Sequence, residues 1–256
     1  MSQDRVCVSV VSHLQAVLVR SLLEDLAAHC GGAIEVVLTV NVDEPLPFVP
    51  GEFGYPVELV RNSAPRGYGA NHNAAFRMCR RKAFCVLNPD IRLAANPFPA
   101  LLEELERGRT GVVAPRIADP AGRTEDSARR FPTLGSLAAK AMGRANALDY
   151  EIGASPFSPD WIAGMFMLFG SEAFKAVGGF DERYFLYYED VDICARLRAA
   201  GYGVRLVPAM SAVHHARRAS RRDWRHRAWH LRSALRYLLT TGRSAARAAP
   251  ANCQDP

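Results

Sequence analysis

Strand-length apolar runs alternate with helical segments through the first 115 residues, and this alternation constrains the fold more than any other feature. The apolar runs cover residues 6–11, 34–40, 57–61, 83–87 and 111–114. Segments with helical spacing or helix signals lie between them, at 16–29, 68–80 and 96–107. Strands joined through helices usually run parallel, and strands that are apolar throughout are covered on both faces. The pattern therefore predicts an α/β fold with a central, mostly parallel sheet flanked by helices.

The alternation stops between residues 115 and 160, a stretch rich in Gly, Pro, Ser and Arg with no clear period. We predict a lid or loop there, with one helix at 134–142. Beyond it we predict strands at 161–169 and 204–207 and helices at 171–177, 189–200 and 223–239. The expected organisation is a domain over 1–215, made of a donor half (1–115), a lid (116–160) and an acceptor half (161–215), followed by a basic helical tail (216–256).

Composition narrows the class of protein. The 256 residues can bury a sizeable core. No apolar run of signal-peptide length follows the first residues, and no stretch approaches the roughly 18–20 apolar residues of a membrane span. The six cysteines are scattered without a CxxC pair, which favours buried thiols in a reducing compartment over disulfides or zinc. We therefore expect a cytoplasmic protein.

The net charge of +6 is unevenly distributed, because ten arginines and one acid, Asp223, lie between Arg217 and Arg247. Tryptophan, leucine and tyrosine are interleaved with these arginines. Such a basic amphipathic segment is typical of a helix at an anionic membrane surface. The alternative is a helix that packs its apolar stripe on the domain and leaves its arginines in water. A nucleic-acid role is also open, although no groove-reading motif is present.

Three acids open the expected helix at 189–200, directly after the aromatic run 184–188. Acids in a first helical turn can simply stabilise the helix dipole, by ~0.3–1 kcal/mol. Asp192 has Arg196 four residues on, which makes an ordinary helix-surface pair. Asp190 has no cation at that spacing, so local structure explains it least. Asp190 is therefore the better candidate for a proton acceptor, with Glu189 intermediate.

Three other segments carry candidate ligand-binding residues, each with a plainer alternative. Asp90 follows an apolar strand, where a metal or phosphate ligand is expected, but Asn88-Pro89-Asp90 is also good turn chemistry. Gly67 and Gly69 precede helical amides that could cradle a phosphate, although a plain turn capped by Asn71 would read the same way. His214 and His215 are either metal ligands or a solvated turn.

Taken together and in order, these segments resemble the family 2 inverting glycosyltransferases of the GT-A fold, especially the bacterial rhamnosyltransferase-like members. The resemblance covers roughly residues 6–220. The matching segments are Val6–Ser12, Asn62 with 67–75, Leu87-Asn88-Pro89-Asp90, 161–168, 177–182 running through 188–197, and His214.

The resemblance implies a role for each candidate residue. Asp90 would hold Mg²⁺ or Mn²⁺ on the donor diphosphate, together with His214 or, in another register, His215. Asp190 would be the catalytic base, supported by Glu189, Trp161 and Gly164. The implied donor-binding residues are Ser12, Asn41, Asp43, Gly67, Gly69, Asn71, Asn73 and Asn88. Asn41 and Asp43 are both candidates for recognising the nucleotide base. Asn88 replaces the first carboxylate of the family's Asp-X-Asp metal motif, which lowers the expected metal affinity.

The expected function is transfer of a sugar from a nucleotide-diphosphate donor to a glycan or lipid-linked acceptor, as in lipopolysaccharide or other surface-polysaccharide synthesis. Rhamnose is the first candidate sugar. The enzyme would be cytoplasmic and peripheral on the inner membrane face, with no nucleic-acid partner; an oligomer is open. One alternative is a non-catalytic basic membrane- or nucleic-acid-binding protein. Another is a different nucleotide-using enzyme, which the missing glycine fingerprint after Val11 argues against.

Overall fold

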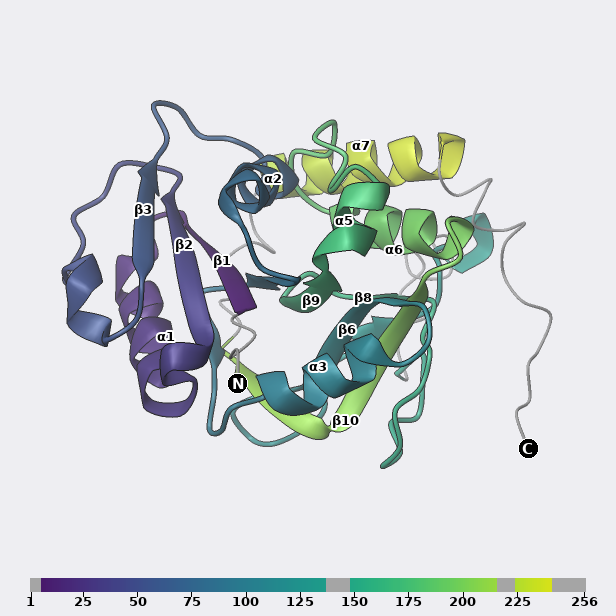
Figure 1. The fold of residues 1–256 in the computed structure, drawn as a ribbon. Coiled ribbons are helices and arrows are strands. Elements are labelled where there is room, and N and C mark those ends of the chain that lie inside the picture. The colour runs from purple at the N-terminus through teal and green to yellow at the C-terminus, as the bar shows by residue number, and fades with distance from the viewer. Residues whose placement is uncertain (1–5, 137–147, 216–223, 241–256) are drawn as a thin grey trace.

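A central sheet of eight strands organises the chain (Figure 1). The computed structural model describes residues 6–136, 148–215 and 224–240. The strand order across the sheet is β3-β2-β1-β4-β9-β6-β10-β5. The strands are β1 (Val6–Ser12), β2 (Ile34–Val40), β3 (Val57–Arg61), β4 (Ala83–Leu87), β5 (Ile91–Arg92), β6 (Thr110–Ala118), β9 (Phe166–Gly170) and β10 (Gly203–His214).

The sheet is mixed but mostly parallel, as the sequence predicts. Strand β1 pairs in parallel with β2 and β4, β2 pairs in parallel with β3, and β6 with β10. Strand β9 runs antiparallel between β4 and β6, and the short β5 runs antiparallel to β10. The carboxyl ends of β1, β2 and β4 therefore meet at one edge of the sheet, where ligand-binding residues of α/β proteins collect.

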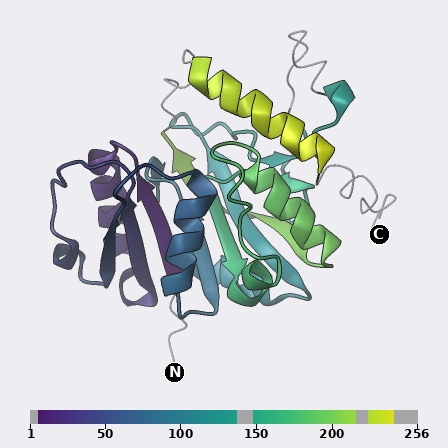
Figure 2. The ribbon, with the colours of Figure 1, turned by 90° about the horizontal axis from the view of Figure 1, so that it is seen from above.

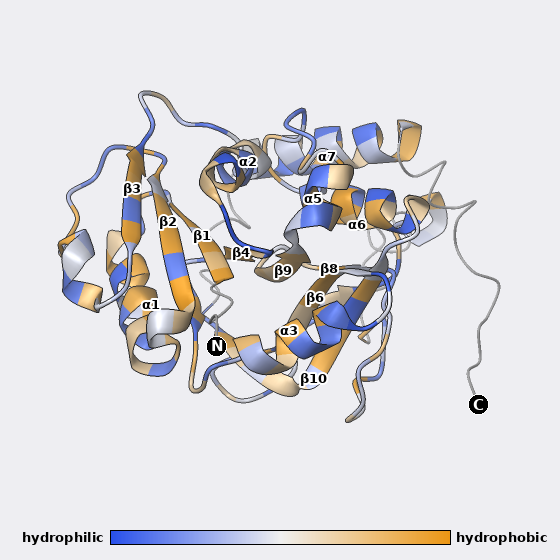
Figure 3. Ribbon diagram, in the orientation of Figure 1, coloured by the Kyte–Doolittle hydropathy of each residue, from blue (hydrophilic) through white to orange (hydrophobic). Residues whose placement is uncertain are grey.

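Helices cover both faces of this sheet (Figures 1 and 2). The described helices are α1 (Ala16–His29), α2 (Tyr68–Met78), α3 (Phe98–Glu106), α5 (Ser171–Ala176), α6 (Glu189–Ala199) and α7 (Trp224–Leu239), with 3₁₀ turns at Gly31–Ala33 and Pro50–Phe53. Helices α1 and α3 pack against one face, whereas α2, α5, α6 and α7 contribute to the core on the other. Figure 3 shows apolar residues concentrated on β4 and β9 between these layers. A smaller two-stranded sheet joins β7 (Ala128–Arg129) to β8 (Trp161–Ile162).

Alternating side chains along β1 show how the sheet divides the core. Val6, Val8 and Val10 enter the cluster beneath α1 and α3, whereas Cys7 enters the cluster beneath α2 and α6. All four side chains are buried. This is why β1 carries apolar residues toward both faces rather than alternating them with exposed polar residues.

Four sequence-based boundaries were wrong. The helix predicted at 68–80 ends at Met78, and the strands predicted at 111–114 and 204–207 extend over Thr110–Ala118 and Gly203–His214. The strand predicted at 161–169 is two strands, β8 and β9, separated by a turn at 163–165. In this turn the Gly164 N–H donates to the carboxylate of Asp190, which lies 26 residues further along the chain. Of the helix predicted at 134–142, residues 134–136 are helical and the rest lies largely outside the described residues.

None of the helices in the described ranges combines the length and hydrophobicity needed to cross a bilayer. The helix expected in the basic tail is present as α7, and it packs on the rest of the fold through Ala234 and Tyr237. The division into donor half, lid, acceptor half and tail stays a prediction.

The strand that follows Asp90 is fastened to helix α1 by one carboxylate. Asp25 Oδ2 and Oδ1 accept hydrogen bonds from Arg92 Nε at 2.6 Å and Nη2 at 2.7 Å. Asp25 Oδ2 also accepts the backbone N–H of Leu93 at 2.9 Å. Burial by itself raises the pKa of Asp25, but the hydrogen bonds from Arg92 and Leu93 outweigh it and the pKa is lowered. The ionised carboxylate therefore fixes the position of β5 and of the residue before it.

We predict that Asp25→Asn lowers the free energy of unfolding at pH 7 by ~1–3 kcal/mol, because charge-assisted hydrogen bonds are lost. A carboxyl whose pKa is lowered by folding stabilises above its unfolded pKa, near 3.8, and loses that contribution as pH falls through the lower folded value. The difference between wild type and variant should therefore shrink below pH 4. Urea unfolding at pH 7 and pH 3 measures it, with Glu24→Gln in an exposed pair as the control. An equal difference at both pH values would contradict the prediction.

Candidate active site

Asp90 and His214 face each other at the edge of the sheet. Asp90 follows β4, and His214 is the last residue of β10. His214 Nε2 lies 3.3 Å from Asp90 Oδ2, and His214 Nδ1 lies 2.7 Å from Glu125 Oε2. His215 is exposed, and it contacts Asp90 through its backbone N–H, which donates to Asp90 O at 2.8 Å. Of the two histidines left open by the sequence, His214 is the one whose ring meets Asp90.

The Asp90 carboxylate suits a divalent cation. Its Oδ1 atom is buried and has no hydrogen-bond partner among the described residues. An uncompensated carboxylate oxygen is a ligand that Mg²⁺ and Mn²⁺ favour. The described ranges contain no group of three or more His, Cys, Asp or Glu side chains that could hold a metal by themselves. The residues present therefore fit a cation that takes most of its ligands from a bound diphosphate and water, as Mg²⁺ commonly does.

Burial and two nearby carboxylates shift the pKa of His214 in opposite directions. Burial favours the neutral ring, but hydrogen bonds and charge from Asp90 and Glu125 outweigh it, so the pKa of His214 is raised. Glu125 lies in the stretch expected to form a lid, where the sequence has no motif. The contact with His214 shows that this residue reaches the edge of the sheet that holds Asp90.

Asp190 belongs to a second group of acids, in the first turn of α6. Its Oδ2 accepts the N–H of Gly164 at 2.9 Å, and its Oδ1 accepts the N–H of Val191 at 2.8 Å. Asp192 instead pairs with Arg196 at 2.7 Å, as the spacing predicts. Asp190 remains partly exposed, and burial raises its pKa despite these backbone hydrogen bonds. A carboxylate with a raised pKa is a stronger proton acceptor.

Tyr68 joins the two groups of acids. Its Oη lies 2.6 Å from Gly164 O and 3.1 Å from Asn88 Oδ1. Burial raises the pKa of Tyr68, and the charges of Glu189, Asp190 and Asp90 raise it further. The same phenol therefore lies within electrostatic reach of Asp90 and Asp190. This is the juxtaposition that a shared site requires.

Asn88 contacts Tyr68 at the position where the metal motif of the resembled family has its first carboxylate. A phenol has one proton, so Tyr68 Oη can donate to Asn88 Oδ1 or to Gly164 O, but not to both. Gly164 O is the nearer acceptor, at 2.6 Å against 3.1 Å. The Asn88 side chain therefore lies against the tyrosine that joins the two groups of acids.

Glu189 is buried beside Asp190. Its Oε2 has no hydrogen-bond partner within the described part of the chain. Burial, and next the charge of Asp190, raise the pKa of Glu189 well above its ordinary value. Both causes favour the neutral form of Glu189 over its carboxylate.

Asn41 and Asn71, two of the asparagines predicted to bind the donor, form a partly buried network with Asn62. Asn41 Oδ1 accepts hydrogen bonds from Asn62 Nδ2 and from the backbone N–H of Arg66, both at 2.8 Å. Asn41 Nδ2 donates to Arg66 O at 3.0 Å and lies 3.1 Å from His13 Nδ1. Asn62 Nδ2 also donates to Asn71 Oδ1 at 2.7 Å. Asn41 and Asn71 therefore shape the loop before α2.

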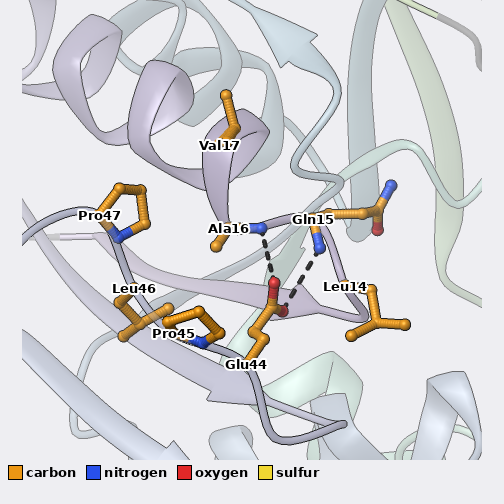
Figure 4. Close-up of a pocket in the computed structure, with 8 residues that line it drawn as sticks. All are labelled: Leu14, Gln15, Ala16, Val17, Glu44, Pro45, Leu46 and Pro47. Carbon is orange, nitrogen blue, oxygen red and sulfur yellow. Dashed lines mark hydrogen bonds between the residues drawn. The ribbon is translucent and has the colours of Figure 1, made fainter.

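The turn after β1 is held by a carboxylate that the sequence analysis missed. Glu44 accepts Ser12 Oγ at 2.5 Å and the backbone N–H groups of Gln15 and Ala16 at 3.3 and 2.9 Å. It lines a pocket of about 540 Å³ with Leu14–Val17 and Pro45–Pro47 (Figure 4). This pocket does not include Asp90 or Asp190. Asp43 points to solvent, with 94% of its side chain exposed and Arg61 at 3.0 Å.

The glycines before and in α2 are needed for packing within the chain. A Cβ atom on Gly67 would lie 2.8 Å from Phe185 O, and one on Gly69 would lie 2.7 Å from Phe180 Cβ. The absence of side chains at Gly67 and Gly69 therefore lets Phe185 and Phe180 of the same chain pack closely against the backbone. Asn73 is also engaged, because its Nδ2 donates to Phe180 O at 2.8 Å and its Oδ1 accepts the Phe180 N–H at 2.9 Å.

The aromatic residues near Asp190 are mostly covered. Trp161 is buried and donates its Nε1–H to Arg130 O at 2.8 Å, and the Arg129 guanidinium lies 5.3 Å from the centre of its ring. Tyr188 is buried against His230 and Tyr237 of α7. Phe185 stays partly exposed and packs against another ring of α7.

Comparison with known proteins identifies the family. The sequence profile described as glycosyl transferase family 2 matches residues 16–168, more than half of the chain. A second profile, described as the N-terminal domain of galactosyltransferase, matches residues 155–219. The chain belongs to glycosyl transferase family 2. It is therefore a glycosyltransferase, the first of the functions expected from the sequence.

Two curated relatives are rhamnosyltransferases. Rhamnosyltransferase WbbL of Escherichia coli (strain K12) is 34% identical over 184 residues, which cover 67% of this chain and 70% of that protein. The N-acetylglucosaminyl-diphospho-decaprenol L-rhamnosyltransferase of Mycobacterium tuberculosis is 32% identical over 207 residues, which cover 72% of this chain and 67% of that protein. The resemblance to rhamnosyltransferase-like members is confirmed.

Solved structures show the same fold at low sequence identity. A mannosyltransferase from Pyrobaculum calidifontis, solved with GDP-mannose and Mn²⁺, aligns with a TM-score of 0.62 and 18% identity, over 97% of this chain and 76% of that one. GalNAc-T7, solved with UDP, GalNAc and Mn²⁺, aligns with a TM-score of 0.57 and 16% identity, over 82% of this chain and 43% of that one. The predicted GT-A fold is confirmed.

The raised pKa of Glu189 has a measurable consequence. An acid whose pKa is raised by folding makes the protein less stable as pH rises above its unfolded pKa, near 4.5, because only the unfolded chain then releases the proton. Glu189→Gln removes this dependence and keeps the shape of the side chain. We expect the unfolding free energy of the variant minus that of wild type to increase by ~1 kcal/mol or more from pH 5 to pH 7.

Urea unfolding at the two pH values measures this difference. Glu58→Gln, on an exposed residue of β3, is the control and should change neither value. If the unfolding free energy of Glu189→Gln falls between pH 5 and pH 7 as steeply as that of wild type, the pKa of Glu189 is not raised by folding.

Proposed function

We propose that this glycosyltransferase moves a sugar, with rhamnose as the first candidate, from a nucleoside-diphosphate donor to a lipid-linked or glycan acceptor, with inversion at the anomeric carbon. The observation that carries the proposal is the placement of Asp90 and Asp190 around Tyr68. The rhamnosyltransferase relatives support the sugar and the lipid-linked class of acceptor. The product would be a surface polysaccharide, made on the cytoplasmic side of the membrane.

Asp190 would act as the general base. Its Oδ2 is fixed by the Gly164 N–H, and the raised pKa of the neighbouring Glu189 favours the neutral form of that side chain. The developing positive charge of the acceptor hydroxyl would then meet one localised carboxylate, that of Asp190. Asp190 would accept the hydroxyl proton as the acceptor oxygen bonds to the anomeric carbon. The bond from that carbon to the diphosphate breaks on the opposite face. One displacement of this kind inverts the stereochemistry and needs no covalent enzyme intermediate.

Asp90 and His214 would form the leaving-group side of the site. Asp90 Oδ1 and His214 Nε2 are the atoms that would hold Mg²⁺ or Mn²⁺. When bound, the cation supplies charge neutralisation for the departing diphosphate. The residues that position this side are Asn88, which reaches Tyr68, and Glu125, which fixes the His214 ring.

The donor-binding and lid assignments stay part of the proposal. The loop shaped by Asn41, Asn62 and Asn71 would present backbone groups to the nucleotide. The exposed Asp43 would remain a candidate for recognising the nucleotide base. Residues 116–160 would close over the site, with Arg129 as a cation near Asp190. Exclusion of water would then limit hydrolysis of the donor.

Replacing the proposed base gives the sharpest test. Asp190→Asn should lower turnover ~10²–10⁴-fold, because an amide cannot accept the hydroxyl proton, while the melting temperature and donor binding stay near wild type. Initial rates with a nucleoside-diphosphate sugar and a synthetic acceptor measure the first effect. Asp192→Asn is the matched control: breaking the pair with Arg196 should lower the melting temperature and preserve turnover below it. Full activity of Asp190→Asn would remove Asp190 as the base.

A thermal-shift panel tests the metal. Nucleoside diphosphates should raise the melting temperature more with Mn²⁺ or Mg²⁺ than with EDTA, since a ligand that binds the folded state stabilises it by mass action. Asp90→Asn should abolish the metal-dependent part of the shift. Glu58→Gln, at an exposed side chain of β3 with no proposed role in binding, should retain it. A metal-dependent shift that survives in Asp90→Asn would place the cation elsewhere.

A further inference from the structure

Helix α7 has an inner face that is fully engaged with the loop before Asp190. His226 Nδ1 lies 2.9 Å from Tyr187 Oη, and Ser233 Oγ donates to Leu186 O at 3.0 Å. The rings of Trp229 and Phe185 have centroids 5.0 Å apart. These contacts fix the helix on the fold and determine which side of it faces away.

The outer face of α7 carries an exposed apolar stripe. Its members are Trp224, Leu231, Leu235 and Leu239, which are 73%, 62%, 51% and 67% exposed. At 3.6 residues per turn they fall within an arc of about 80°, opposite the residues that contact the loop. Helix α7 lies at the outside of the molecule, beyond α6 (Figures 1 and 2). We name these four residues the outer stripe.

Cations border the outer stripe on both sides. Arg227 and Arg232 are exposed, and on a regular helix they lie to either side of the four apolar residues. Residues 224–239 contain four arginines and no carboxylate. A helix with tryptophan and leucine on one strip, bordered by arginines, matches the chemistry of a bilayer interface with anionic headgroups.

Other partners fit this surface less well. Two copies of the chain packed stripe to stripe would bring their own arginines together, and like charges at a symmetric interface repel. A nucleic acid would satisfy the arginines but leave the leucines in water. An anionic lipid surface satisfies both, since acyl chains take the apolar side chains and headgroups take the guanidinium groups.

We propose that the outer stripe docks on an anionic lipid bilayer. The bilayer then lies against the helix whose opposite face contacts Phe185, Leu186 and Tyr187, immediately before Asp190. An acceptor anchored in that bilayer is thereby delivered to the side of the site that holds the base. This last step rests on the proposed function, whereas docking itself does not.

Vesicle flotation tests the docking. Wild type should float with phosphatidylcholine vesicles that contain phosphatidylglycerol, and much less with phosphatidylcholine alone or at high salt. The double variant Leu231→Gln with Leu235→Gln keeps good helix formers, and its partition coefficient should fall ~tenfold or more, because two leucines no longer leave water. The matched control is Val17→Gln with Val49→Gln, at residues 68% and 64% exposed but away from α7. It should float like wild type.

Any one of four results would overturn the proposal. The first is wild-type binding that is absent or independent of phosphatidylglycerol, and the second is a stripe variant that floats as well as the control. The third is a wild-type dimer that the stripe variant converts to monomer without any change in flotation, which would assign the stripe to a second copy. A melting temperature within a few degrees of wild type shows that the variant is folded. Duplex DNA that binds through the same leucines, with no vesicle binding, would assign the surface to nucleic acid.

Activity separates this proposal from the proposed function. The stripe variant should match wild type on a water-soluble acceptor and lose several-fold in rate on a lipid-linked acceptor presented in anionic vesicles. Wild type could fail to transfer sugar to either acceptor and still float through the stripe in a phosphatidylglycerol-dependent way. That result would support the docking surface and show that the proposed substrates are wrong. If transfer occurs equally on both acceptors in the stripe variant, the delivery step fails and the proposed chemistry stands.

Discussion

The hydrogen bond from the Gly164 N–H to Asp190 Oδ2 is the contact on which the site depends. It lies in the turn between β8 and β9, where the Gly164 N–H donates to a carboxylate rather than to a neighbouring strand. This turn exposes Gly164 O to Tyr68, and Tyr68 in turn reaches Asn88. A single short segment thus connects the end of β4, the start of α2 and the start of α6.

The loop before Asp190 carries strain that the surrounding structure must balance. Tyr187 and Tyr188 both have left-handed backbone angles, with φ of 70° and 69°, which cost ~1–3 kcal/mol each for residues with a side chain. Contacts from α7 hold both rings, and Phe185 O accepts the Tyr68 N–H at 2.9 Å. Such strain persists where packing over-determines it, and here it sets the position from which α6 begins. The basic helix is therefore part of the architecture of the site.

Much of this molecule follows from local sequence pattern. The strands and helices of the first 115 residues, the mixed parallel sheet and the Asp192–Arg196 pair were predictable, because each depends on periodicity or on residues a few positions apart. Asp190 stood out for a similar reason, since its own helix offers it no cation. Glu44, Glu125 and Tyr68 could not be found in this way. Their partners lie 20 to 96 residues away along the chain.

By itself, the sequence determined the elements, their order and the acids on which chemistry depends, because backbone preference and burial periodicity are short-range properties. Tertiary structure alone decided which side chains of those elements meet. It turned His214 rather than His215 toward Asp90, filled the space beside Gly67 and Gly69 with Phe185 and Phe180, and divided the faces of α7 between the site and the outside. The reason is that sheet register and helix packing bring together residues far apart in the chain, and no local pattern records those distances.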